Sequence, residues 1–289
     1  MSTGKIDCKC PGFFVITLHG FWLFGNLSAQ VLSKSPDLRK LAAYQNILYI
    51  AFLECWQMAG VSIHAVMIIC DDVFSQTLNF VAGDTAIFAW ITIIVLRFFL
   101  SLNRLVVVTN LSFLGFLKSS AFHKATLAIA TVILLGLIVS GVLIKNVFFV
   151  DISIVGYVFP SHVVNTFETY VSNILCTSAF LLYVLTGLYL LKVKQNTNVT
   201  QNFGEVRLMA SSALGFSYEM FMIILFHFVL PYVSVPMEMG SVVMMMWAFL
   251  PGFNGLMLVI LNKSFRTRFF GLNRKQSITT KTIVQQMAV

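Results

Sequence analysis

Charged residues are scarce in this sequence. Only 10% of its 289 residues are Asp, Glu, Lys or Arg, whereas soluble globular domains carry about a quarter. Apolar residues make up 58% of the chain, and the mean hydropathy is +0.87. So little polar surface does not cover the core of a soluble domain of this length. The composition therefore excludes a water-soluble globule and a disordered chain, and the expected solvent is lipid.

Motifs that carry covalent chemistry are also missing. The sequence has no phosphate-binding loop, dinucleotide fingerprint, zinc-protease helix or nucleophile elbow. Its five cysteines are too few for a disulfide-stapled secreted domain, and its five histidines show no metal-ligand spacing. We therefore expect no enzyme activity, no cofactor and no metal site.

Long apolar runs are present instead. Seven of them reach the roughly 20 residues that a helix needs to cross about 30 Å of hydrocarbon. The sequence thus predicts an all-α membrane protein with one seven-transmembrane domain over residues 1–289. Its predicted spans cover residues 12–32, 43–69, 80–102, 125–149, 168–191, 208–234 and 239–261. Cations alternate with Phe over residues 263–271, which predicts a short amphipathic eighth helix on the inner leaflet, followed by a flexible tail over 272–289.

Lys and Arg residues gather on one side of the predicted bundle. With the N-terminus outside, 15 of the 19 cations flank inner loops or the tail. The positive-inside rule therefore predicts an external N-terminus and a cytoplasmic C-terminus. The net charge of +8 is an orientation signal and not a nucleic-acid footprint. The inner cations are Lys34, Arg39, Lys40, Arg104, Lys118, Lys124, Lys192, Lys194, Arg207, Lys263, Arg266, Arg268, Arg274, Lys275 and Lys281. The acids assigned to the outer side are Asp7, Asp71, Asp72, Asp84, Asp151, Glu168 and Glu238.

The first apolar run has an alternative interpretation as a cleaved signal peptide. Lys5 and Lys9 precede it, and the small residues Ser28 and Ala29 follow it. Its removal would leave six spans and place the cation-rich tail outside. We therefore expect a retained signal anchor.

Three ionisable residues lie well inside predicted spans, where a charge costs at least about 2.5 kcal/mol unless it is paired or hydrated. They are Glu54, Arg97 and Glu219. Arg97 and Arg104 are seven residues apart, so both point to one face of the third helix. We predict that Arg97 pairs with Glu54, Glu219 or both, and that the pairing changes between resting and active states. A permanent structural bridge, or an Arg97 that snorkels to the interface, is the alternative.

Other residues within the predicted spans suggest helix hinges and a ligand pocket. Pro231 and Pro251 remove backbone donors inside the sixth and seventh spans and, with Asn254, are the predicted hinges. The outer halves of the spans carry aromatic, Met and polar residues that suit a small, mainly apolar ligand. For any single member of this set, ordinary helix packing or interface anchoring is the commoner explanation. The candidate pocket residues are His64, Met67, Phe88, Tyr170, Asn173, His227, Met244 and Trp247.

Short motifs in a fixed order sharpen the prediction. Ser101-Leu-Asn-Arg104 ends the third span, Trp247 and Pro251-Gly-Phe-Asn254-Gly lie in the seventh, and Leu261-Asn-Lys-Ser-Phe-Arg266 follows. Upstream stand Pro36, Tyr44-Gln-Asn-Ile, Glu54, Gly60, Gly83 and Trp90. From about residue 25 to 268, this order resembles the nematode serpentine chemoreceptors, class T above all, with class X or a related class as alternatives. These are rhodopsin-like seven-transmembrane G-protein-coupled receptors.

The resemblance implies a location and a set of partners. It implies a multi-pass protein of the plasma membrane or sensory cilium that binds a small-molecule ligand and activates a heterotrimeric G protein. Arg104, with Asn103, Asn262 and Arg266, would form the G-protein-coupling residues. Two features depart from better-known receptors: no cysteine lies between residues 145 and 167, and the seventh span lacks Asn-Pro-x-x-Tyr.

Three functions therefore remain to be separated. A chemosensory receptor comes first, and a multi-pass transporter or ligand-gated channel is the alternative. A transporter of this size is expected to show two similar halves with broken helices, and no such repeat is visible in the sequence. An orphan scaffold that retains the fold without signalling is the third interpretation. The sequence leaves the ligand, the G-protein subtype and the oligomeric state open.

Overall fold

The structure, a computed structural model, describes residues 42–144, 148–152, 156–158, 160, 162–196, 203–233, 237–261, 266–267 and 270–271. The predicted first span (12–32) and the tail (272–289) lie outside these residues. Only four residues of the predicted eighth helix are described. They are Arg266, Thr267, Phe270 and Gly271, which are helical and exposed.

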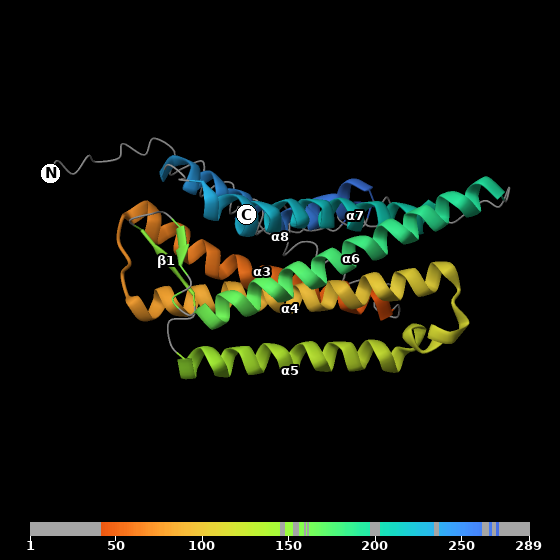
Figure 1. The fold of residues 1–289 in the computed structure, drawn as a ribbon, viewed down its shortest axis with the longest axis horizontal. Coiled ribbons are helices and arrows are strands. Elements are labelled where there is room, and N and C mark those ends of the chain that lie inside the picture. The colour runs from red at the N-terminus through yellow and green to blue at the C-terminus, as the bar shows by residue number, and fades with distance from the viewer. Residues whose placement is uncertain are drawn as a thin grey trace, which may run out of the picture.

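Six long helices run along the described bundle, each antiparallel to the one before it (Figure 1). They are α3 (Ala42–Cys70), α4 (Gln76–Thr109), α5 (Ser120–Ile144), α6 (His162–Asn196), α7 (Phe203–Ile224) and α8 (Met237–Leu261). Among the described residues, five helices are long and apolar enough to cross a bilayer, and the apolar part of α8, Met245–Leu261, is a shorter candidate. The six helices overlap the second to seventh predicted spans.

The central element is α4. It packs against α3, α5 and α6, and its residues from Ala86 to Ile94 are all buried. The helix ends where Asn110 adopts a left-handed conformation (φ 53°, ψ 37°), which Asn tolerates better than most residues. A 3₁₀ helix, η1 (Ser112–Lys118), then leads to α5. Because α4 crosses the whole bundle, it can position charged side chains at several depths.

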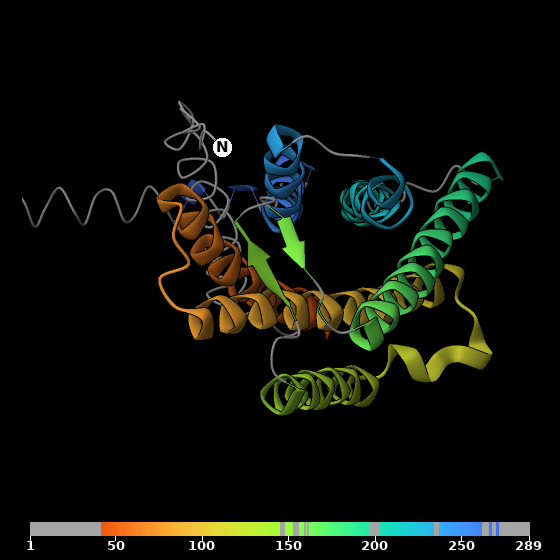
Figure 2. The same ribbon diagram turned by 60° about the vertical axis from the view of Figure 1, so that its left-hand side comes forward.

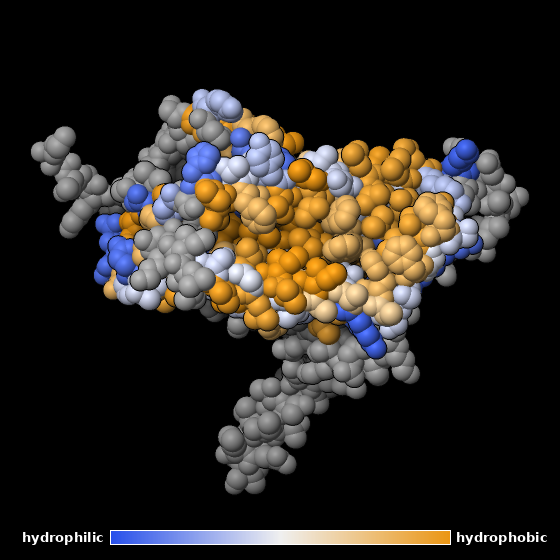
Figure 3. Space-filling view, turned by 60° about the horizontal axis from the view of Figure 1, so that its bottom comes forward, coloured by the Kyte–Doolittle hydropathy of each residue, from blue (hydrophilic) through white to orange (hydrophobic). Residues whose placement is uncertain are grey.

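The peripheral helices are apolar on their exposed faces. Val132, Leu135 and Val139 of α5 are each more than half exposed, as are Leu181 and Leu185 of α6. One face of the molecule carries a continuous apolar surface with hydrophilic residues gathered toward its two ends (Figure 3). Such a large apolar surface suits a lipid environment, and the protein is a multi-pass membrane protein.

A small antiparallel hairpin closes one end of the bundle, which we call the hairpin end. Its strands are β1 (Phe149–Asp151) and β2 (Gly156–Val158), and Val150 pairs with Tyr157 (Figure 2). The opposite end, where α4 finishes, we call the Arg104 end. The prediction that the fourth span continues to residue 149 is wrong, because α5 ends at Ile144. The hairpin residues are apolar because they pack into the bundle, so the apolar run continues past the helix.

The end of α7 is irregular. The α-helix stops at Ile224 and continues as a π-helical turn, η2 (Leu225–Val229), and then a 3₁₀ turn, η3 (Leu230–Tyr232). Pro231 lies in η3, where its missing N–H terminates the helix. The prediction of a proline in the interior of the sixth helix is therefore wrong for Pro231. Pro251, in contrast, lies inside α8 as predicted, and that helix continues beyond it.

Candidate functional site

A cluster of charged side chains lies in the middle of the bundle. Arg97 comes from α4, Glu54 from α3 and Glu219 from α7. An Nη2 atom of Arg97 lies 2.5 Å from Oε1 of Glu54, and Nη1 of Arg97 contacts Glu219. All three side chains are less than 10% exposed. The structure thus brings together the three residues that the sequence placed inside spans, and one arginine joins both glutamates.

The fourth member of this cluster is Asn254 of α8. Its Nδ2 atom donates to Oε1 of Glu54 (3.1 Å) and to the carbonyl of Leu250 (3.3 Å). On α7, Gly215 lies so close to Asn254 that a side chain there would collide with the amide oxygen. The residue predicted as a hinge is therefore part of the charge cluster. We call Glu54, Arg97, Glu219 and Asn254 the charge cluster. It ties four helices together and holds two carboxylates for one guanidinium.

Arg104 lies about two helical turns from Arg97, near the end of α4. It is partly buried, and its Nη2 atom is enclosed without a hydrogen-bond acceptor among the described residues. Asn103 is 3% exposed, and its Nδ2 donates to the carbonyl of Leu117 (2.6 Å). Asn103 therefore fixes η1 against α4, and the prediction that it contacts a G protein does not fit this position. Of the two residues, Arg104 is the one with an unused hydrogen-bond donor, its Nη2 group.

The other two predicted coupling residues lie after α8. Arg266 is exposed, and its Nη1 donates to the carbonyl of Ile260 (3.0 Å). A cation at this position satisfies a free carbonyl at the helix end. Asn262 lies outside the described residues. Arg266 therefore caps α8 and leaves the rest of its guanidinium at the surface.

Two of the predicted pocket residues, His64 and Trp247, hold the hairpin in place. His64 is fully buried, with Nε2 3.0 Å from the carbonyl of Asn79 and Nδ1 3.5 Å from the Tyr157 hydroxyl. The carbonyl of Asn79 only accepts, so Nε2 of His64 carries the proton, and Nδ1 accepts from the Tyr157 hydroxyl. Phe148 stacks on Tyr157 at 4.5 Å, and Trp247 packs edge-on against both rings. Aromatic side chains of the hairpin thus fill the space predicted for a ligand.

The remaining predicted pocket residues do not form one surface. Met67 is fully buried in the core, and Tyr170 is 64% exposed on α6, so it is a lipid-facing side chain rather than a pocket wall. Asn173 is partly buried and bonds the carbonyl of Thr169. The side chain of Met244 lies outside the described residues. A mixed aromatic and Met composition fits packing, lipid contact and a pocket alike, so composition alone does not locate a pocket.

A second polar cluster, which the sequence did not predict, lies nearer the hairpin end. Glu168, which the sequence assigns to the outer side at the start of the fifth predicted span, lies in α6 and is only 4% exposed. Its Oε1 accepts from Trp90 Nε1 (3.1 Å) and Ser172 Oγ (2.7 Å), and its Oε2 lies 3.4 Å from His227 Nε2. Thr169 contacts the other nitrogen of His227 at 3.3 Å. His227 belongs to η2, so this cluster joins α4 and α6 to the π-helical turn, an irregularity found often at functional sites.

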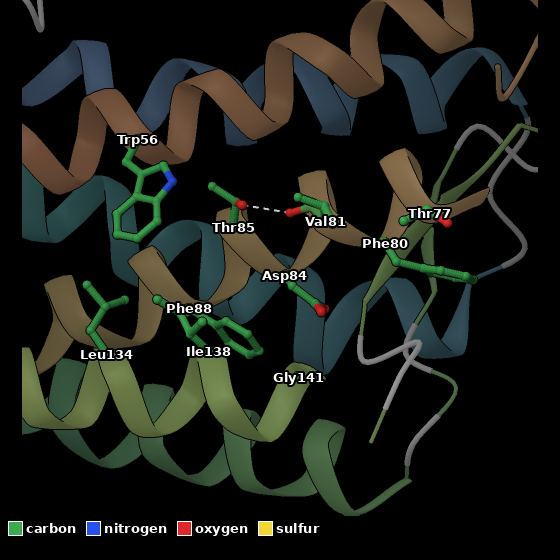
Figure 4. A pocket seen from close by; sticks show the side chains of 10 residues that line it. All are labelled: Trp56, Thr77, Phe80, Val81, Asp84, Thr85, Phe88, Leu134, Ile138 and Gly141. Atoms are coloured by element: carbon green, nitrogen blue, oxygen red, sulfur yellow. Dashed lines mark hydrogen bonds between the residues drawn. The ribbon is translucent and has the colours of Figure 1, made fainter. Parts of the chain in front are cut away.

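The structure also contains a cavity at a position that the sequence did not predict. It has a volume of about 590 Å³ and lies between α3, α4 and α5 near the hairpin end (Figure 4). Of the eight predicted pocket residues, only Phe88 lines it. Asp84 is its ionisable wall residue and lies on α4, eight residues after Gln76. The sequence assigns Asp84 to the outer side within the third predicted span, and the residue lies in the corresponding helix near the hairpin end.

Comparison with known proteins adds one finding. No protein-family model and no curated protein matches the sequence. Among solved structures, the chain is similar to squid rhodopsin, with a TM-score of 0.65 and 13% sequence identity over 89% of this chain and 83% of the rhodopsin chain. At this identity the similarity concerns the fold. The described helices therefore have the fold of the squid rhodopsin helix bundle.

Proposed function

We propose that this protein is a G-protein-coupled chemosensory receptor of the nematode serpentine type. A small ligand binds between the helix halves at the hairpin end, and the Arg104 end opens to a heterotrimeric G protein. In this proposal the hairpin end is extracellular, the C-terminus is cytoplasmic, and the protein lies in the plasma membrane. The charge asymmetry of the sequence supports this orientation.

The observation that carries the proposal is the charge cluster in the centre of a rhodopsin-like fold. Buried charges destabilise a membrane protein unless they are paired, so a cluster of three requires a compensating role. Here Arg97 divides its guanidinium between Glu54 and Glu219, which lie on different helices. Loss of either contact leaves the other intact. The cluster therefore supports two arrangements of α7 relative to α3 and α4.

In this proposal the G protein binds at the Arg104 end of the bundle. The guanidinium of Arg104 has a buried nitrogen with no acceptor among the described residues. Backbone carbonyls at the end of an inserted partner helix are suitable acceptors for such a group. When α7 moves away from Arg97, the space beside α4 widens and Arg104 becomes accessible. A ligand that prefers this arrangement shifts the population toward it.

A ligand panel tests the proposal. Wild type, Arg104→Ala and Lys124→Ala are expressed in cells that report activation of several G-protein classes. Lys124 is an exposed cation at the same end of the bundle and serves as the matched control. We expect at least one small hydrophobic compound to activate wild type and Lys124→Ala, and Arg104→Ala to lose about tenfold or more of that response at equal surface expression.

Two outcomes would contradict the proposal. One is a ligand-evoked ion current that persists when G proteins are blocked, because this identifies a channel. The other is an Arg104→Ala response equal to that of wild type, because Arg104 then has no part in the output.

A further inference from the structure

The cavity between α3, α4 and α5 has the properties of a ligand site. Its volume, about 590 Å³, falls within the range of about 300–1,000 Å³ that holds small molecules in proteins. Helix α3 contributes Trp56, α4 contributes Phe88, and α5 contributes Leu134 and Ile138 (Figure 4). These walls are apolar and aromatic, so they suit the hydrocarbon part of a ligand.

The mouth of the cavity faces the side of the bundle. Val81 lines the cavity and is 57% exposed, and Leu135 of the neighbouring α5 surface is 56% exposed. Both belong to the apolar surface that contacts lipid. The hairpin segment lies at the same end of these helices, beside Gly83 and Asp84, and does not cover the exposed side chain of Val81. A hydrophobic molecule dissolved in the bilayer can therefore enter without passing the hairpin.

The charge of the cavity selects the polar part of the ligand. Asp84 accepts a hydrogen bond from the backbone N–H of Phe148, but its Oδ1 atom is enclosed and has no donor among the described residues. Within the described part of the chain Asp84 also forms no salt bridge. A carboxylate in apolar surroundings gains most from a cation that donates hydrogen bonds.

Two further features favour an ammonium group. The Thr85 hydroxyl donates a hydrogen bond to the carbonyl of Val81 (2.6 Å), so its lone pairs remain available to accept hydrogen bonds. Trp56, Phe80 and Phe88 place aromatic rings around the cavity, and the faces of such rings attract cations. Gly141 sets the width, because a Cβ atom there would lie 2.8 Å from the Phe88 ring and 2.9 Å from Oδ2 of Asp84.

We propose that this cavity binds hydrophobic amines in their protonated form, with the ammonium group at Asp84 and the hydrocarbon part between Trp56, Phe88 and α5. The ligand enters from the lipid-facing side. Its effect on signalling rests on the proposed receptor function, whereas binding itself does not. The proposal therefore names both a site and a ligand class.

Direct binding tests the site without any G protein. The full chain is reconstituted in phosphatidylcholine nanodiscs, and binding of radiolabelled n-octylamine is measured against empty nanodiscs. Octanol and octanoate, which share the hydrocarbon chain, are the neutral and anionic competitors. We expect saturable binding of octylamine with one site per protein, and competition by octanol or octanoate at least about tenfold weaker than by unlabelled octylamine.

Matched variants locate the binding site. Asp84→Asn is expected to weaken octylamine binding at least about tenfold and Asp84→Glu to retain it, while Asp71→Asn, which changes an exposed acid at the end of α3, leaves it unchanged. Gly141→Ala narrows the cavity and weakens binding, whereas Gly136→Ala on the same helix meets open space and does not. Monodisperse elution and retained binding by Asp84→Glu show that the fold is intact.

Three results would overturn the proposal. They are no saturable binding to wild type, equal binding by Asp84→Asn and wild type, and octanol competing as well as octylamine. Octylamine binding without G-protein activation would support this site and count against the receptor function. Activation of a G protein by another compound, with no octylamine binding, would leave the receptor function standing and reject this site.

Discussion

The carboxylates of the charge cluster and the carboxylate at the cavity differ in the partners that the protein gives them. In the charge cluster, Glu54 and Glu219 share Arg97, Asn254 donates a further hydrogen bond, and the three charged side chains are buried. At the cavity, Asp84 has one backbone donor and open space beside it. The difference indicates that the first group is compensated by the protein itself. The Asp84 carboxylate, in our proposal, is paired by the cation of a bound ligand.

The comparison predicts its largest effect at Arg97. Arg97→Met leaves two buried carboxylates without a cation, which costs about 3–5 kcal/mol of stability. We expect little folded protein to reach the surface, whereas Lys124→Met, which removes an exposed cation, expresses normally. Fluorescence-detected size-exclusion chromatography measures both. Normal yield of Arg97→Met would show that the carboxylates do not depend on Arg97.

Neutralising the partners sharpens this test. A variant that combines Arg97→Met with Glu54→Gln and Glu219→Gln has no buried charge left in the cluster. Uncharged residues of similar volume often replace a buried ion group at little cost. We therefore expect this triple variant to recover most of the yield lost by Arg97→Met alone. No recovery would place the defect in the packing around the substituted side chain rather than in the charges.

An intermediate effect is expected where α3 meets α4 between the two regions. A Cβ atom at Gly60 would collide with the backbone carbonyl of Ala82, which has no freedom to move aside. Gly60→Ala should therefore destabilise the protein by about 1–3 kcal/mol. Gly136→Ala faces open space and should be neutral or slightly stabilising. Thermal unfolding in detergent compares the two, and equal melting temperatures would contradict the close α3–α4 packing.

The smallest effect, with the opposite sign, is expected at the cavity. Without added amine, Asp84→Asn removes a carboxylate that lacks a cation, and Asn retains an acceptor for the Phe148 N–H. We expect its melting temperature to equal or slightly exceed that of wild type, a gain of at most about 1 kcal/mol. A large decrease would show that Asp84 belongs to a structural ion pair. The cavity and the charge cluster would then be alike.

The helical bundle and the three charged members of the charge cluster were predictable from sequence. Apolar runs give the length of each span, and the spacing of Arg97 and Arg104 puts both on one helix face. Depth along the helices then brings Arg97 within reach of Glu54 and Glu219. The participation of Asn254 was not predictable, because an uncharged amide within a span can bond to many different groups and its position in the sequence does not indicate which one.

The hairpin-end features were harder to predict for a physical reason. Asp84 and Glu168 lie near helix ends, where hydropathy does not distinguish an exposed acid from a buried one. The hairpin consists of two three-residue strands whose apolar residues extend the preceding helical run. The cavity depends on where α5 lies against α4, which is a property of the tertiary structure. Aromatic residues alone therefore do not locate a pocket.

The most direct test of the charge cluster as a switch is the basal activity of Glu219→Gln. This change leaves one carboxylate for Arg97, so the fold is retained, and it releases the contact that ties α7 to α4. Nucleotide exchange is measured on a panel of purified G-protein α subunits, using membranes that contain equal amounts of wild type, Glu219→Gln and the control Asp71→Asn. We predict ligand-independent exchange above wild type for Glu219→Gln alone. Exchange equal to wild type on every α subunit would contradict the account.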